Sequence, residues 1–168
     1  MEFPWIPSLD VVLRTYGGKI HLMIELKKEA LADPFSQGQI LRPMFAGLEP
    51  GKDFHILSLD AEVLRRVEFA PRQALILVAE LNLLKQSRIA LRENYGGIAG
   101  HYWLVGDALL ARHRRHGQKL GTGYIGSRNA LFREINRRVD WVFSNRAADL
   151  QTILNTVGAV PANRFRPG

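Results

Sequence analysis

Two acids and a lysine near the amino terminus have residue types and spacing that suit phosphate chemistry. Asp10 lies in the apolar run Leu9–Arg14, and Glu25 and Lys27 end a second apolar run that covers residues 19–27. Two carboxylates can hold a divalent cation, and an ammonium group beside them can stabilise charge on a phosphate. This set predicts a Mg²⁺-dependent hydrolase of phosphodiester bonds.

The element expected to bring the two acids together is a β-hairpin. Gly17-Gly18 stands between the two apolar runs and is typical of a two-residue turn. That turn places Asp10 directly opposite Glu25, with Cβ atoms roughly 5 Å apart. Facing carboxylates repel each other unless a proton or a cation lies between them, so the register predicts a metal site. A three-residue loop would break this register.

Side-chain alternation in the second run separates its polar and apolar residues. Glu25 and Lys27 project from one face of the strand, and the apolar side chains project from the other: Ile20, Leu22, Ile24 and Leu26. We expect the apolar face to pack on the core. The alternative for the polar face is a solvated surface with an ordinary pair of neighbouring charges.

The next segment favours a helix and then a strand. Asp33 is a typical N-cap and Pro34 a typical first helical residue, so a helix is expected to begin there and to end before Pro43. Residues 52–59 predict another strand, and residues 61–67 predict a short helix. The order strand, hairpin, strand, helix, strand indicates an α/β fold with a mixed sheet.

Residues 7–59 resemble the core of the PD-(D/E)xK, or restriction-endonuclease-like, nucleases. They are most similar to the nuclease module of type I restriction motor subunits. The resemblance rests on three segments: Leu9–Leu13, Ile24–Lys27 and Phe35–Ile40. It implies a restriction-endonuclease-like mixed sheet flanked by helices, followed by a helix-rich basic half.

The resemblance also implies roles for individual residues. Asp10 and Glu25 would bind Mg²⁺ (or Mn²⁺), Lys27 would orient the attacking water or stabilise the phosphorane, and Gln39 (or Gln37) would face the site from the helix. The implied activity is that of a DNA endonuclease or exonuclease. The implied assemblies are a homodimer or a larger restriction or repair complex.

Composition restricts the class of protein. The 168 residues suit a nuclease-like core of residues 1–70 with a helix-rich basic region of residues 71–168 packed on it, or one single domain. The absence of cysteine excludes disulfides and thiol chemistry. No apolar run has membrane-spanning length, and we expect a cytoplasmic protein without a membrane partner.

The net charge of +7 is unevenly distributed along the chain. Residues 1–84 hold nine Lys/Arg and eleven Asp/Glu, whereas residues 85–168 hold fourteen and five. A basic half predicts a polyanionic partner, here DNA, and the alternative is a solubilising surface. The residues expected to contact nucleic acid are Arg112, Arg114, Arg115, Lys119 and Arg128.

The second half contains few decisive element signals. The run Leu75–Ala79 fits either a buried strand or the start of a long helix. Residues 98–116 predict a helix whose end carries His113 and His116 among arginines, and we interpret both histidines as part of a basic helix end. Residues 127–145 predict another helix, with Ser127 as its N-cap. Three aromatic residues, Tyr102, Trp103 and Trp141, are expected in the core and not as base-stacking platforms.

A glycine-rich segment precedes the last predicted helix. Residues 121–126 match the pattern G-x-G-x-x-G, but no apolar strand comes directly before them, as a dinucleotide fingerprint requires. A loop at a helix start can still hold a nucleic-acid phosphate. The third interpretation of residues 121–126, besides a dinucleotide site and a phosphate-binding loop, is a flexible connector without a ligand.

Two other functions remain open. The first is a nucleic-acid-binding module with the nuclease fold and no activity, favoured by Pro43 at a position where related modules often have tyrosine. The second is an acyl-CoA-dependent N-acyltransferase, suggested by residues 79–81 and by the glycines that follow Tyr95. The acyltransferase requires a splayed strand ahead of Gly96.

Overall fold

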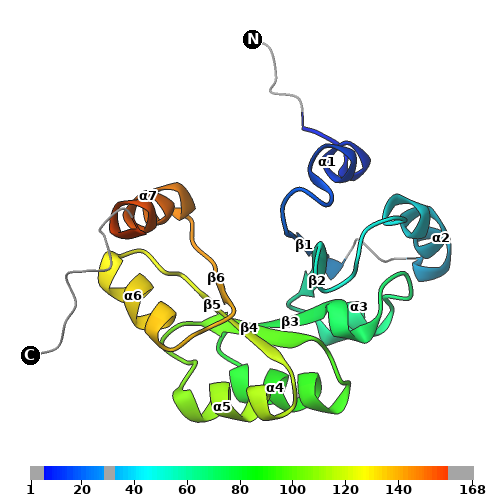
Figure 1. Cartoon of the computed structure of the whole chain (residues 1–168). Coiled ribbons are helices and arrows are strands. Elements are labelled where there is room, and N and C mark those ends of the chain that lie inside the picture. Colours follow the sequence, from blue (N-terminus) through cyan, green and yellow to red (C-terminus); the bar gives the residue numbers. More distant parts are fainter. Residues whose placement is uncertain (1–5, 29–32, 159–168) are drawn as a thin grey trace, which may run out of the picture.

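The structure is a computed structural model that describes residues 6–28 and 33–158. Six strands form one sheet in the order of the chain, and every neighbouring pair is parallel. The sheet curls into a half-barrel that is open on one side (Figure 1). The strands are β1 (Leu22–Glu25), β2 (Phe54–Ser58), β3 (Leu75–Ala79), β4 (Gly97–His101), β5 (Lys119–Gly123) and β6 (Trp141–Val142).

Helices connect the strands and flank the outer side of the curved sheet (Figure 1). Each parallel connection therefore crosses over the sheet through a helical segment, as parallel strands require. The fold is α/β, and the expected mixed sheet is wrong. The helices are α1 (Leu9–Tyr16), α2 (Pro34–Met44), α3 (Ala61–Arg65), α4 (Leu83–Arg92), α5 (Asp107–Arg115), α6 (Arg128–Asn136) and α7 (Ala147–Gly158), with a 3₁₀ turn at Arg72–Ala74.

The predicted hairpin at the amino terminus is wrong, because its first arm is helix α1. The Ser8 side chain caps this helix by accepting a hydrogen bond from the Val11 amide. Leu9 and Leu13 are spaced four residues apart, which places both on one helical face, and Leu13 is buried in the core. Gly17 is the C-cap of the helix and not a hairpin turn residue.

The predicted alternation of faces in β1 is confirmed. Leu22 and Leu26 join the main core between the sheet and the helices, and Ile24 packs against that core. Ile20, expected on the same face, precedes β1 and is exposed, so the prediction is wrong for this residue. Glu25 points to the inner side of the half-barrel, where it lines a cavity with Lys27. The strand pairs with β2 through the parallel register Glu25↔Leu57.

Other predicted elements in the first half are also confirmed. Asp33 caps α2 by accepting from the Ser36 amide, and the helix begins at Pro34 as expected. It continues to Met44 with Pro43 inside it, so its predicted end is too early. β2 and α3 form where they were predicted.

The predicted helix over residues 98–116 is wrong, because the segment begins inside strand β4 and becomes helical only at Asp107. Ser127 caps α6 as predicted, but that helix ends at Asn136 and β6 follows. Residues 121–123 belong to β5, so the glycine-rich segment is partly strand.

Glycine in β4 permits close contact between neighbouring strands. A Cβ at Gly97 would lie 2.1 Å from the Lys119 carbonyl oxygen. Because this oxygen belongs to the backbone of β5, the clash could be relieved only if one of the two strands moved. The inner face of the sheet carries a small apolar cluster of Leu57, Ile76 and Ala99. Among the described helices, none is both long and apolar enough to cross a bilayer.

We predict that Gly97→Ala lowers the free energy of unfolding by about 3 kcal/mol or more, because the new methyl group must displace strand backbone. Urea unfolding followed by circular dichroism measures the change. Gly38→Ala is the control, since a Cβ in that α2 position meets nothing within 4 Å. The control should gain about 0.5–1 kcal/mol from helix propensity. Equal stability of the Gly97→Ala variant and the wild type would contradict the packing described here.

Candidate functional site

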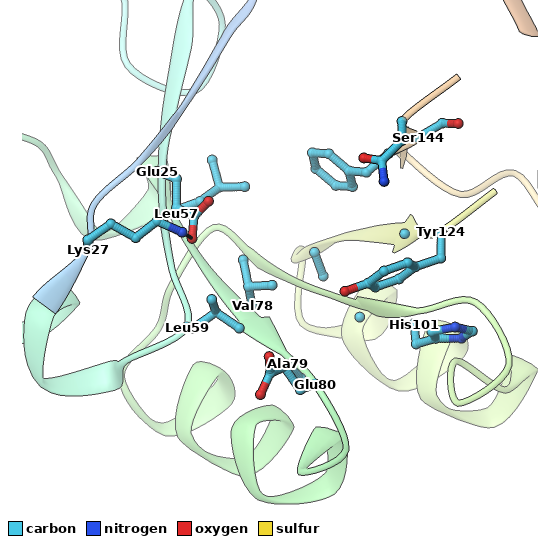
Figure 2. Close-up of a pocket in the computed structure, with 15 residues that line it drawn as sticks. Glu25, Lys27, Leu57, Leu59, Val78, Ala79, Glu80, His101, Tyr124 and Ser144 are labelled. Carbon is cyan, nitrogen blue, oxygen red and sulfur yellow. Dashed lines mark hydrogen bonds and ion pairs between the residues drawn. The ribbon is translucent and has the colours of Figure 1, made fainter. Parts of the chain in front are cut away.

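A cavity of about 560 Å³ opens at the carboxyl ends of the strands, and we call it the carboxyl-edge cavity. This edge is where loops of parallel α/β sheets and barrels place binding and catalytic groups. Figure 2 shows side chains converging on the cavity from several strands. Its polar and aromatic lining residues are Glu25, Lys27, Glu80, His101, Tyr124, Phe143, Ser144 and Asn145.

Glu25 and Lys27 form an ion pair on one wall of this cavity. The Lys27 Nζ lies 2.5 Å from the Glu25 Oε1, and both side chains remain partly exposed. Both face the cavity because inward and outward side chains alternate at the end of β1. The pair therefore presents a carboxylate and an ammonium group to any ligand in the cavity.

His101 ends β4 on the opposite wall and lines the same cavity. Its Nδ1 accepts a hydrogen bond from the Trp103 amide at 3.2 Å, so in the neutral ring the proton resides on Nε2. The ring stacks with those of Tyr102 and Tyr124 at centroid distances of 5.0 and 4.9 Å. His101 can therefore offer an oriented N–H donor to a ligand.

Tyr124 follows β5 with a backbone φ of 65°, in the left-handed region that is unusual for a residue with a side chain. Its hydroxyl points into the cavity, toward the side on which Glu25 and Lys27 lie (Figure 2). The residue is 70% exposed although its ring stacks on His101. Strained backbone of this kind is concentrated at ligand sites.

Glu80, His101 and Tyr124 were not among the predicted site residues, although a signal for them exists in the sequence. Each directly follows, or ends, a strand whose buried residues are apolar or small. The strands of the second half begin at residues 75, 97, 119 and 141, each 22 residues after the last. The equal spacing reflects a regular succession of strand–helix units, which is recognised from the strand positions in the structure.

Two of the predicted catalytic residues lie elsewhere in the fold. Asp10 is in the first turn of α1, where it forms an ion pair with Arg14, and the predicted register with Glu25 is wrong. Gln39 is exposed on α2 and does not line the carboxyl-edge cavity. Glu25 and Lys27 are brought together, and their catalytic roles stay predictions.

The predicted basic surface is divided between the two edges of the sheet. Lys119 begins β5 at the amino edge, with its Nζ 5.3 Å from the centre of the Trp141 ring. Arg128 begins α6 beyond the other end of that strand, where its guanidinium lies over Phe132. The three remaining arginines are exposed in the last turn of α5: Arg112, Arg114 and Arg115.

Two expectations about side chains in the second half are wrong. His113 is fully buried, with its Nε2 2.8 Å from the Ser87 hydroxyl and its Nδ1 2.7 Å from the Gln118 amide oxygen. Burial lowers the pKa of this histidine, so it serves as a neutral core group and not as part of a basic helix end. Trp103 is 76% exposed and lies outside the core.

A second cavity, of about 490 Å³, lies at the amino ends of the strands, and we call it the amino-edge cavity. His55 contributes to its wall and stacks edge-on against Trp141 at 4.8 Å, which links β2 to β6 across the half-barrel. The His55 Nδ1 lies 2.8 Å from the His21 Nε2. Residues at this edge of βα folds generally serve stability, so the carboxyl-edge cavity is the better candidate site.

Comparisons with known proteins identify the fold. No protein-family model matches the chain, and no curated protein matches it by sequence. A phosphodiesterase from Oleispira antarctica, solved with the product sn-glycerol-3-phosphate, is similar with a TM-score of 0.67 and 18% sequence identity. The match covers 89% of this chain and 61% of that structure. A glycerophosphodiester phosphodiesterase from Agrobacterium tumefaciens is similar with a TM-score of 0.62 and 18% sequence identity. The match covers 84% of this chain and 59% of that structure.

A proposed glycerophosphodiester phosphodiesterase from Galdieria sulphuraria gives a TM-score of 0.69 and 14% identity over 88% of this chain. The chain spans 62% of the length of that structure. These likenesses show a shared fold with an all-parallel sheet. They overturn the resemblance to PD-(D/E)xK nucleases, and with it the assignment as a DNA nuclease and the expected DNA partner.

The acyltransferase alternative requires a splayed strand ahead of Gly96, and the structure does not show one in the residues that it describes. Strand β3 pairs with β4 in a regular parallel register, and β4 pairs with β5 in the same way.

We predict that the fold loses stability as the pH falls from about 6.5 toward 4, partly through His55. Burial, with help from the charges of His21 and Lys119, lowers the pKa of His55 from 6.5 to about 4. Its protonation in this window favours the unfolded state, and the stabilisation is fully present above pH 6.5. Urea unfolding between pH 4.5 and 7.5 should show a smaller slope in His55→Gln than in the wild type. Identical slopes would contradict this assignment.

Proposed function

We propose that this chain binds a glycerophosphodiester in the carboxyl-edge cavity and hydrolyses its phosphodiester bond. The observation that carries the proposal is the Glu25–Lys27 pair, which faces a cavity formed by the carboxyl ends of a parallel sheet. The similarity in fold to glycerophosphodiester phosphodiesterases supports the choice of substrate. The volume of the cavity suits a small organic ligand.

The proposed reaction transfers the phosphoryl group to water. The water oxygen bonds to phosphorus, the bond from phosphorus to the head-group oxygen breaks, and the products are a phosphomonoester and an alcohol. Lys27 stabilises negative charge that develops on the non-bridging phosphate oxygens. The neutral His101 ring donates a hydrogen bond from its Nε2–H to the leaving oxygen, and the proton that the attacking water gives up passes to that oxygen, so the alcohol leaves neutral.

A divalent cation, Mg²⁺ or Mn²⁺, is part of the proposal. Glu25 supplies the carboxylate oxygens that such hard cations prefer. Within residues 6–28 and 33–158, no group of three or more acids and histidines could hold a metal ion by itself. Mg²⁺ commonly uses one or two carboxylates and completes its shell with phosphate and water, so Glu25 fits a metal that binds together with the substrate. Such a cation would neutralise phosphate charge.

We predict that Lys27→Met lowers kcat/KM for a glycerophosphodiester by about 10²–10³-fold, the usual cost of removing one stabilising donor. The side chain is 65% exposed, so folding should be unaffected. Enzyme-coupled detection of the released phosphomonoester measures the rate. Lys28→Met is the matched control, since Lys28 is exposed and does not line the cavity. Equal rates for Lys27→Met and Lys28→Met would contradict the proposed role.

We predict that EDTA abolishes hydrolysis and that added Mg²⁺ or Mn²⁺ restores it. Glu25→Gln should require a metal concentration at least about tenfold higher than the wild type, because the amide is a neutral and weaker ligand. Titration of the rate with Mg²⁺ measures this shift. Full activity in EDTA would contradict the need for a metal, and an unchanged metal requirement in Glu25→Gln would contradict the assigned ligand.

A further inference from the structure

The two carboxylates of the carboxyl-edge cavity differ in their counter-charges. The charge of the Glu25 carboxylate is balanced within the protein, because the Lys27 ammonium group lies 2.5 Å away. Glu80 directly follows β3, is exposed, and lines the same cavity. Among the described residues, no lysine, arginine or histidine forms an ion pair with Glu80. The cavity therefore presents one carboxylate whose charge the folded chain does not balance.

An aromatic surface lines the cavity together with this carboxylate. Tyr124 stacks one face on His101, with an interplanar angle of 20°, and the remaining surface of its ring is exposed. Its backbone φ of 65° holds the ring in this position at the end of β5. Figure 2 shows Tyr124 directed into the cavity that Glu80 also lines. Its hydroxyl has no hydrogen-bond partner within the described part of the chain.

A carboxylate and an aromatic face in one cavity are complementary to an organic cation. Alkylammonium groups bind the faces of tyrosine and tryptophan rings, and a nearby carboxylate adds charge attraction. We propose that Glu80 and Tyr124 form a subsite for an alkylammonium head group, such as choline or ethanolamine, on the diester. This inference rests on the proposed function, and it names the alcohol that leaves: an amino alcohol, with its phosphate directed toward Lys27.

The arrangement separates the two charges of such a substrate. Lys27 offers a cation to the phosphate, and Glu80 offers an anion to the ammonium group. Glu25 is the acid beside Lys27, whereas Glu80 comes from β3, so the two carboxylates stand on different strands. If Glu80 acted on the phosphate or a metal, its loss would affect every diester equally. A head-group subsite predicts a greater loss for cationic diesters than for others.

Binding of choline alone tests the subsite without catalysis. Titration monitored by NMR should show saturable shifts in the wild type, with affinity reduced about tenfold in Glu80→Gln and in Tyr124→Asn. Asparagine tolerates the left-handed backbone, so the second variant removes the ring without adding strain. Glu68→Gln is the control with the same change in net charge, because Glu68 is exposed and outside the cavity. Equal choline affinity in the wild type and Glu80→Gln would overturn the subsite.

Kinetics with two diesters provide the second test. In Glu80→Gln, kcat/KM should fall about tenfold more for a choline diester than for a diester with a glycerol head group. An equal fall for both substrates would overturn the subsite and indicate a role at the phosphate or metal. If no diester is hydrolysed by the wild type, the proposed function fails, and choline binding that depends on Glu80 would still support the subsite. If both diesters are hydrolysed but Glu80→Gln keeps the wild-type preference, the subsite fails alone.

Discussion

The position of every candidate site residue depends on the shared direction of the six strands. Because all neighbouring pairs are parallel, the residues that end each strand gather at one edge of the sheet. Side-chain alternation then decides which of them face the inside of the half-barrel. Glu25, His101 and Tyr124 meet in one cavity for this reason, although almost 100 residues separate the first from the last. The opposite edge, with the buried His55 against Trp141, joins β2 to β6 and holds the curvature.

The first half shows what sequence patterns could and could not predict. The two faces of β1, the capped start of α2 and the positions of β2 and α3 follow from alternation and capping residues, and all are found. The hairpin prediction was wrong because a run as short as Leu9–Arg14 fits a helix as well as a strand. Ser8 decides between them by capping α1, and the ion pair from Asp10 to Arg14 spans one helical turn. Glu25 and Lys27 were identified for the right local reason, their common face, and assigned to the wrong fold.

The second half could be predicted less well because its strands have weak strand signals. β4 and β5 contain glycine where strands usually carry branched residues, and the close contact at Gly97 is visible only in three dimensions. The strand starts are regularly spaced, 22 residues apart, but this regularity is recognised only once the structure locates the strands. The basic residues expected to contact nucleic acid do not all lie at one edge of the sheet, since Lys119 begins β5 and Arg128 lies beyond the other end of that strand.

The central claim is that the carboxyl-edge cavity is the phosphate site. The most direct test is an NMR titration of the chain with sn-glycerol-3-phosphate in the presence of Mg²⁺, with backbone amides assigned. We expect saturable shifts at Glu25, Lys27 and His101, and no comparable shifts around His55 and Lys119 in the amino-edge cavity. Shifts confined to the amino-edge cavity, or no saturable shifts at all, would contradict the account.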